Sequence, residues 1–335
     1  MGSPRAGQWS AVASLAPVLT TPFTTLLGCS HPLQLAPMGR IGTPELAAAV
    51  TNAGGLGMLP GGDARATLEP MLDEVAAATR GSFGVNFLLP FLDPVAVDLA
   101  ASRARLVEFF YGDPDSELVD RVHATGALAA WQIGSVGEAR AAVEAGCDVV
   151  VAQGTEAGGH VRGGLALFPL LEQVLGSVGV PVVAAGGIAT RRTVAAALAA
   201  GADAVRVGTR FAVAQESAAH PDYVEALLRA VGEDTVLTEA FGLDWPHAPH
   251  RVLRSCLETA ETSDDAVVAV RDEDGREVPI ELWDSTPPST NVRGRVAAMA
   301  LYAGEGVAAV QRVQPAAEIV RELVEGAETL LARLP

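Results

Sequence analysis

Residues 181–211 read PVVAAGGIATRRTVAAALAAGADAVRVGTRF, and the fold that we expect follows from this stretch. It holds two short apolar runs, Val182–Ala185 and Ala204–Val207, on either side of an alanine-rich segment. Two glycines follow the first run, and Gly201 separates the alanine-rich segment from the second run. Because glycine commonly ends a helix, the stretch predicts a strand, a helix and a second strand in close succession.

Six further apolar runs precede this unit, and amphipathic segments separate them. They are Leu33–Ala36, Leu56–Leu59, Phe83–Leu88, Leu106–Phe110, Ala127–Gln132 and Val149–Ala152. Thr43 before a proline is typical of a helix start, and Ser135 with Glu138 has the spacing of a capping box. Strands that are almost wholly apolar are typical of a parallel sheet with both faces buried. Eight such strands separated by helices predict an α/β fold, the (β/α)8 TIM barrel, with a doubly wound open sheet as the alternative.

The chain is expected to have four parts. Residues 1–14 lack the pattern of a signal peptide and are expected to form a loose extension, and 15–215 to form the barrel. Residues 216–300 carry many charges and prolines, which predicts an insertion or lid subdomain, mostly helical, with turns at 271–277. Residues 301–335 are expected to be a helical segment that docks on the barrel. Its apolar face contains Ile319, Leu323, Ala327 and Leu330.

The composition excludes several classes of partner. A net charge of −17 argues against nucleic acid or an anionic membrane as the main partner. No apolar stretch near ~20 residues is free of glycine, proline or charge, so we expect no membrane-spanning segment. Cys29, Cys147 and Cys256 are widely spaced, which disfavours a zinc site or a disulfide scaffold and predicts a reducing, cytoplasmic location.

The chain contains no lysine, so every basic side chain is an arginine or a histidine. This absence excludes aldolases and pyridoxal-phosphate enzymes that form a Schiff base through lysine. It also excludes the phosphate-binding P-loop, whose lysine contacts the phosphates of the nucleotide.

Glycine-rich turns end the last two expected strands. The seventh strand ends at Gly186 and Gly187, and the eighth runs through Val207 into Gly208 and Thr209. Phosphate groups commonly bind after the seventh and eighth strands of such barrels. Backbone N–H groups left bare by glycine are suited to hold an anion, so we expect a phosphate site here.

Neutral polar side chains mark the ends of other expected strands. Asn86 lies in the third strand, Gln132 ends the fifth and Gln153 follows the sixth, while the first leads into APM at 36–38. No cluster of metal ligands accompanies them. Buried amides need hydrogen-bond partners, which a flat ring with carbonyls and ring nitrogens would supply. A ring with a phosphate predicts FMN, and the lack of G-x-G-x-x-G after a strand argues against Rossmann-bound FAD or NAD.

Several motifs together resemble the nitronate monooxygenase family, formerly called 2-nitropropane dioxygenases. They are APMGRIGTPELAAAVTNAGGLGML at 36–59, GVNF at 84–87, VVVAQGTEAGGH at 149–160, the stretch 181–211 quoted above and YAGEGVAAVQRV at 302–313. The resemblance extends from about residue 15 to residue 331. It implies an FMN-binding (β/α)8 barrel with a helical extension.

The resemblance also implies the residues of the site. The implied FMN contacts are Ala36, Pro37, Met38, Asn86, Gln132, Gln153, Gly158, Gly159, Gly186, Gly187, Arg206, Val207, Gly208 and Thr209. The implied catalytic residue is His160, either as the base that removes the α-proton of a nitroalkane or as a group that positions a nitronate. Imidazole ordinarily titrates near neutral pH, which suits both roles.

The activity that the resemblance implies is oxidation of alkyl nitronates or nitroalkanes with O2 to a carbonyl compound and nitrite. The same motifs occur in flavin-dependent reductases, so the alternative is an FMN enzyme that uses NAD(P)H to reduce an enoyl thioester or a quinone. A flavin carrier without catalysis would leave His160 without a purpose. The partners are therefore a small-molecule substrate with O2 or NAD(P)H, and a homodimer is one option for the assembly.

Three positions depart from the family pattern. Arg40 follows the APMG turn, where a small residue is more common, and Arg206 stands where glutamine is frequent. Val161 separates His160 from Arg162, whereas the basic residue usually follows the histidine directly. Arg40 and Arg162 are expected to place positive charge near the flavin, which would favour an anionic substrate.

The remaining polar and aromatic residues have structural roles as the first expectation. Surface or packing roles are expected for His31, His123, His220 and Trp131, and a backbone-capping role for Glu156. His247 and His250 lie in the lid candidate, where a substrate-facing role is the alternative to a structural one.

Overall fold

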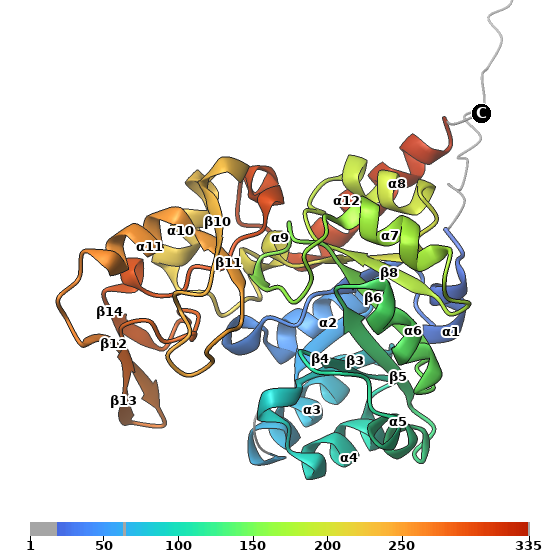
Figure 1. The fold of residues 1–335 in the computed structure, drawn as a ribbon, viewed down its shortest axis with the longest axis horizontal. Helices are drawn as coiled ribbons and strands as arrows, with labels where there is room; N and C mark the ends of the chain where they lie inside the picture. Colours follow the sequence, from blue (N-terminus) through green and yellow to red (C-terminus); the bar gives the residue numbers. More distant parts are fainter. Residues whose placement is uncertain (1–18, 63–64, 334–335) are drawn as a thin grey trace, which may run out of the picture.

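Eight parallel strands, alternating with helices, form the larger part of the molecule (Figure 1). The structure is a computed structural model that describes residues 19–62 and 65–333, so the expected extension at 1–14 lies outside the described residues. The strands are β1 (Leu33–Leu35), β2 (Gly57–Pro60), β3 (Phe83–Leu88), β4 (Leu106–Phe110), β5 (Leu128–Ile133), β6 (Val149–Gln153), β8 (Val182–Ala185) and β9 (Ala204–Val207). All eight expected strands are confirmed, each to within one residue at either end.

The sheet closes on itself. Its strand order is β1-β9-β8-β6-β5-β4-β3-β2, and a parallel bridge between Gln34 and Leu56 joins the two outer strands. The backbone N–H of Leu56 donates to the carbonyl of Leu33 at 2.8 Å, and that of Leu35 donates to the carbonyl of Leu56 at 2.9 Å. The (β/α)8 barrel is therefore confirmed, and the open sheet is wrong.

Helices cover the outside of the barrel, and their starts follow local capping chemistry. They are α1 (Pro22–Leu27), α2 (Pro44–Asn52), α3 (Arg65–Ala78), α4 (Pro94–Arg103), α5 (Ser116–His123), α6 (Val136–Glu144), α7 (Leu167–Leu175), α8 (Arg191–Ala199), α9 (Thr209–Ala212) and α12 (Ala316–Leu331). The Thr43 hydroxyl accepts from the N–H of Leu46 at 3.0 Å, which caps α2. Ser135 accepts from the N–H of Glu138 at 3.2 Å, whereas the Glu138 carboxylate accepts from Gly134 rather than closing the capping box.

The barrel core lies between the strands and the surrounding helices. Trp131 is fully buried in it, and its indole N–H donates to the carbonyl of Gly112 at 3.1 Å, so the expected packing role is confirmed. Helix α12 adds Ile319, Val320 and Leu323 to the same core. It lies along α8, where Gly326 leaves no room for a side chain because a Cβ would be 2.7 Å from Arg191.

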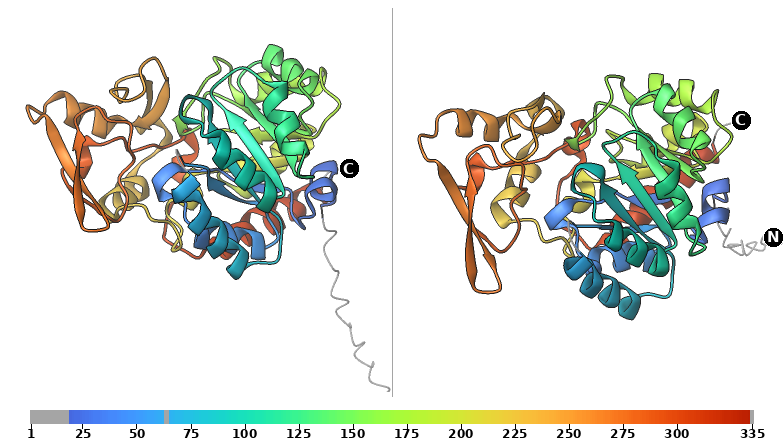
Figure 2. Two further views of the ribbon diagram at one scale, coloured as in Figure 1. Left: turned by 90° about the horizontal axis from the view of Figure 1, so that it is seen from below. Right: turned by 60° about the horizontal axis from the view of Figure 1, so that its bottom comes forward.

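A smaller domain stands beside the barrel (Figures 1 and 2). It contains α10 (Pro221–Arg229), α11 (Arg254–Glu261), β10 (Thr235–Thr238), β11 (His250–Leu253), β12 (Val267–Glu273), β13 (Arg276–Glu281) and β14 (Val292–Gly294). The expectation of a mostly helical subdomain is wrong, because two three-stranded antiparallel sheets accompany the two helices. The charged stretch that was expected to form turns is a hairpin. Asp274 and Gly275 at its tip have φ of 54° and 85°, the signature of a tight hairpin turn.

The smaller domain is joined to the barrel by a short strand pairing. Strand β7 (Gly159–His160) lies in the loop after β6 and pairs antiparallel with β11, so that His250 faces His160 and Arg251 faces Gly159. A second apolar core, which includes Tyr223, Phe241 and Met299, lies on the smaller-domain side. None of the helices in the described part of the chain is long and apolar enough to cross a membrane.

We expect Leu323→Ala to lower the free energy of unfolding by about 3 kcal/mol, because it leaves a cavity between α12 and the barrel. Urea denaturation followed by circular dichroism measures the change. The exposed neighbour on the same helix, Glu325→Ala, should shift the free energy by about 0.5 kcal/mol or less. Equal effects of the two substitutions would show that α12 does not pack on the core.

Candidate active site

A cavity of about 470 Å³ lies where all eight barrel strands end, between the barrel and the smaller domain. Ligand sites of (β/α)8 barrels lie at this carboxyl-terminal face. Aromatic side chains from both parts line it, including Phe91, Phe110, Trp245 and Tyr302. A volume of this size is ordinary for a cofactor or a small ligand, so this cavity is the candidate active site.

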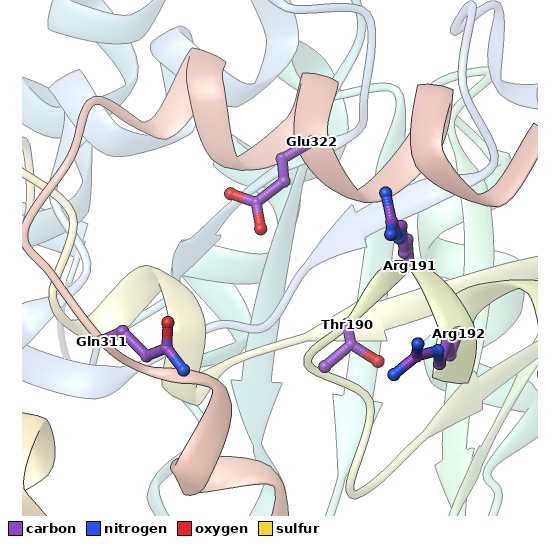
Figure 3. A pocket seen from close by; sticks show the side chains of 5 residues that line it. All are labelled: Thr190, Arg191, Arg192, Gln311 and Glu322. Carbon is purple, nitrogen blue, oxygen red and sulfur yellow. The ribbon is translucent and has the colours of Figure 1, made fainter. Parts of the chain in front are cut away.

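A second hollow of about 390 Å³ lies outside the barrel, between α8 and α12 (Figure 3). Its lining residues are Thr190, Arg191, Arg192, Gln311 and Glu322. None of the residues that the sequence predicts for the site is among them, so the first cavity remains the candidate active site.

The structure brings together all but one of the predicted site residues. Those that line the cavity are Ala36, Pro37, Met38, Asn86, Gln132, Gln153, Gly158, Gly159, His160, Gly186, Gly187, Arg206, Gly208 and Thr209. The exception is Val207, whose side chain is fully buried in the barrel core. Its carbonyl accepts from the N–H of Ala36 at 2.9 Å, so Val207 ties two strand ends together instead of lining the cavity.

Glycines leave backbone exposed at one end of the cavity. Gly186 and Gly187 have φ of 116° and 65°, a conformation that L side chains rarely adopt. A Cβ on Gly306 would lie 2.8 Å from the carbonyl oxygen of Gly187, and one on Gly158 would lie 2.5 Å from the nitrogen of Gly304. Backbone therefore packs on backbone here, and no side chain stands between the peptide groups and a bound ligand.

The floor of the cavity, at the strand ends, is polar. Asn86, Gln132, Gln153 and Arg206 are all buried, and all four line the cavity. The Arg206 guanidinium pairs with the carboxylate of Glu108 inside the barrel. Arg206 therefore reaches the cavity as one half of an ion pair, which the sequence did not predict.

Sequence reasoning missed Glu108 and Gln34, two fully buried polar residues beneath this floor. Glu108 accepts from the side-chain amide of Asn86 at 2.8 Å and from that of Gln34 at 3.3 Å. A signal was present, because each stands in the middle of an otherwise apolar strand. Alternation of side chains along a strand would have placed both toward the barrel interior.

His160 lies on β7 inside an aromatic box. Its ring stacks on Trp245 with centroids 4.0 Å apart, and the rings of His250, Tyr302 and Tyr111 lie 5.2, 5.6 and 5.9 Å away. Its Nε2 atom is buried and has no hydrogen-bond partner among the described residues. Burial, with a smaller contribution from His250, lowers the pKa of His160 to about 3. The expectation that His160 titrates near neutral pH is wrong, and its imidazole is neutral at pH 7.

His250 has a structural role, and the substrate-facing alternative is wrong for it. The ring is fully buried and does not line the cavity. Its Nδ1 lies 2.8 Å from the carbonyl of Ala248, and its Nε2 accepts from the N–H of Phe241 at 3.3 Å. These partners fix the tautomer with the proton on Nδ1. His247 also does not line the cavity, and its side chain is 93% exposed.

The two arginines expected near the flavin lie in different environments. Arg40 lines the cavity, and its guanidinium lies 3.5 Å from the carboxylate of Glu273. Arg162 does not line it, because Val161 takes the buried position and turns Arg162 outward. There Arg162 pairs with Glu138 at 2.8 Å and Asp113 at 2.5 Å. The expectation for Arg162 is therefore wrong.

Three other residues with an expected structural role, Glu156, His123 and His220, have local partners. Glu156 accepts from the N–H of Leu167 at 2.9 Å and so caps the start of α7, as expected. His123 lies 2.8 Å from the carboxylate of Asp148, and His220 accepts from the N–H of Asp222 at 3.1 Å.

The barrel and its cavity give the fold and the place of the site, and comparisons with known proteins give the class of enzyme. The family model described as nitronate monooxygenase matches residues 20–99 and 90–326. This chain belongs to that family, and it is an oxidoreductase. The nitronate monooxygenase of Pseudomonas aeruginosa is 33% identical, and the match covers 92% of this chain and 99% of that protein.

Other relatives carry different names. A (3aS,4S,5R,7aS)-5-hydroxy-7a-methyl-1-oxo-octahydro-1H-indene-4-carboxyl-CoA dehydrogenase of Rhodococcus jostii is 39% identical over 71% of this chain and 67% of that protein. FabK from Thermotoga maritima has a similar structure, with a TM-score of 0.76 and 31% identity over 94% of this chain and 98% of that one. The nitroalkane oxidase of Streptomyces ansochromogenes has a TM-score of 0.74 and 29% identity over 94% of this chain and 100% of that one.

The neutral state of His160 predicts a pH dependence of stability. The folded pKa of about 3 lies below the unfolded value of about 6.5, so only the unfolded chain binds the proton between these two pH values. Stability is therefore lost as the pH falls below about 6.5. When the pH falls from 7 to 5, this residue should lower the free energy of unfolding by about 2 kcal/mol.

The matched variant is His160→Phe, which retains a flat ring against Trp245 but has no titrating group. Urea titrations at pH 7 and pH 5 should show a smaller loss of stability for this variant than for the wild type, by about 2 kcal/mol. An identical loss in both proteins would mean that His160 is not held neutral in the fold.

Proposed function

We propose that this protein is an FMN-dependent nitronate monooxygenase that oxidises alkyl nitronates with O2 to a carbonyl compound and nitrite. The observation that carries the proposal is a pair of unpaired polar atoms, Gln153 Oε1 and His160 Nε2, buried beside one cavity at the barrel mouth. Buried polar atoms without protein partners commonly await a ligand. Membership of the nitronate monooxygenase family supports the same assignment.

The residues of the cavity fit FMN. Glycine backbone at Gly187 and Gly208 is suited to the phosphate, in the place where (β/α)8 barrels bind one. The amides of Asn86, Gln132 and Gln153 would hold the carbonyl and N–H groups of the ring. When bound, FMN supplies the electron transfer between the substrate and O2.

The environment of His160 favours nitronates over neutral nitroalkanes as substrates. A general base works best when its pKa lies near the working pH, and that of His160 is lowered to about 3. A neutral imidazole retains one N–H, which can donate a hydrogen bond to an oxygen of a nitronate that has already lost its proton. Trp245 and Tyr302 enclose the ring and exclude water, which strengthens such a hydrogen bond.

We expect His160→Phe to lower kcat/KM for a nitronate by about 100-fold, because it removes the hydrogen-bonding group beside the reacting centre. The FMN content, read from the visible absorbance, should stay unchanged. The surface variant His123→Gln serves as the control and should retain wild-type rates. Wild-type kcat/KM for His160→Phe would remove this residue from the mechanism.

Arg40 is proposed to attract the anionic substrate. The chain carries a net charge of −17, which repels anions, so a cation at the cavity wall raises the local concentration of substrate. Because Arg40 is half exposed, the effect should be modest. Arg40→Gln should raise KM for a nitronate by about threefold at low salt and leave kcat unchanged, as measured by O2 uptake. An unchanged KM, matching that of Arg65→Gln on the barrel exterior, would contradict this role.

The proposed function is tested by mixing the purified yellow protein with an alkyl nitronate and following O2 uptake and nitrite release. Both should occur, and anaerobic NAD(P)H should leave the flavin absorbance unchanged. A colourless protein that cannot be reconstituted with FMN would overturn the proposal. Bleaching by NAD(P)H, without nitrite from any nitronate, would overturn it in favour of the second candidate.

The second candidate is an FMN-dependent oxidoreductase that exchanges electrons with NAD(P)H and acts on an enoyl thioester or a quinone. The observation in its favour is the 39% identity to a protein named as a carboxyl-CoA dehydrogenase. In that case His160 would donate a hydrogen bond to the substrate carbonyl. The neutral imidazole is compatible with that role, so the anaerobic NAD(P)H experiment separates the two candidates.

A further inference from the structure

The floor of the cavity contains an ion pair that has no role in the proposed reaction. Glu108 on β4 and Arg206 on β9 reach each other across the barrel interior, and their side chains are 0% and 5% exposed. A buried ion pair costs desolvation energy that its own attraction commonly does not repay. Apolar residues would stabilise the barrel at least as well, so the position of this pair below the cavity calls for another explanation.

The pair determines which atoms of two amides, Asn86 and Gln132, face the cavity, and the backbone of His160 does the same for Gln153. Asn86 donates its amide N–H to Glu108 at 2.8 Å, which leaves its Oδ1 for a ligand. Gln132 accepts from Arg206 at 2.5 Å through Oε1, which leaves its amide N–H groups. Gln153 donates to the carbonyl of His160 at 3.0 Å, and its Oε1 is the unpaired atom. The three amides therefore present to the cavity an acceptor at Asn86, a donor at Gln132 and an acceptor at Gln153.

Backbone register keeps these groups in place. Glu108 stands directly beside Asn86 on the neighbouring strand, and Arg206 stands beside Gln34. Gln34 bridges the two charges, since it donates to Glu108 and accepts from Arg206, each at 3.3 Å. Arg206 is thereby held at three of its nitrogens, and neither charge can turn away from the other without leaving a buried group unpaired.

We propose that Glu108 and Arg206 are positioning residues that fix the polarity of the cavity floor and keep its net charge at zero beneath the flavin ring. The inference rests on the proposed binding of FMN. Reduction adds negative charge to the flavin, so a net positive floor favours the reduced form and a net negative floor favours the oxidised form. A neutral pair leaves the flavin without either bias while still orienting the amides of Asn86 and Gln132.

The test compares the wild type, Glu108→Gln and the double variant Glu108→Gln/Arg206→Gln as FMN-loaded proteins. Arginine cannot lose its proton in a protein, so Glu108→Gln leaves one uncompensated positive charge below the ring. At a fixed potential set by a reference dye, the ratio of reduced to oxidised FMN should rise at least about tenfold in this variant. In the double variant the ratio should return to within about twofold of the wild type, because the floor is neutral again.

A third variant keeps the test decisive if Glu108→Gln does not fold. Arg206→Gln removes the cation and keeps the Glu108 carboxylate, so the floor becomes less positive and the ratio of reduced to oxidised FMN should fall below that of the wild type. That fall should be absent from the double variant, which has no carboxylate there. Leu323→Ala is the control for lost stability alone, and its flavin potential should match the wild type.

The outcomes separate the two proposals. A wild-type protein that binds no FMN overturns the proposed function and this inference with it. A wild-type protein that binds FMN, with equal ratios in the wild type and Glu108→Gln or equal ratios in the wild type and Arg206→Gln, overturns this inference alone. A shift of the same size in Leu323→Ala would also overturn it, because loss of stability would then explain the change.

Discussion

The pairing of β7 with β11 is the interaction on which the site depends. Two residues of the loop after β6 pair with the smaller domain, and one of them is His160. This short pairing joins the smaller domain to the barrel mouth. It places the imidazole of His160 in the wall of the cavity at the strand ends. Gly158 is needed because a Cβ there would lie 2.5 Å from the nitrogen of Gly304, and Gly159 because its φ is 77°.

Desolvation of His160 then determines its protonation state. The same domain that covers the cavity brings Trp245 and Tyr302 onto His160, and their enclosure lowers the pKa of the imidazole to about 3. A protein that needed His160 as a base at neutral pH would place a carboxylate beside it to raise its pKa. Here the neighbours are aromatic rings and His250, whose tautomer is fixed by backbone groups. This environment supports the proposal that the substrate arrives as an anion.

The barrel could be predicted from the sequence because its strands are almost wholly apolar and glycines end their helices, as Gly201 does. The smaller domain could not, because strands such as β13 are charged and exposed and carry no core periodicity. The residues that line the cavity could be named from a resemblance, but their protonation states and hydrogen-bond partners could not. Glu108 could have been found as the one acid in an apolar strand, but its pairing with Arg206 and the partners of Arg162 join segments that are distant in sequence. The pKa of His160 depends on Trp245, which is distant in sequence and close only in the fold.

A crystal structure of the FMN-loaded protein with an unreactive nitronate analogue tests the proposed site directly. We expect the phosphate at Gly187 and Gly208, the ring against Asn86, Gln132 and Gln153, and the imidazole of His160 within hydrogen-bonding distance of the analogue. A flavin bound elsewhere, or an analogue that leaves His160 Nε2 without a partner, would contradict the proposal.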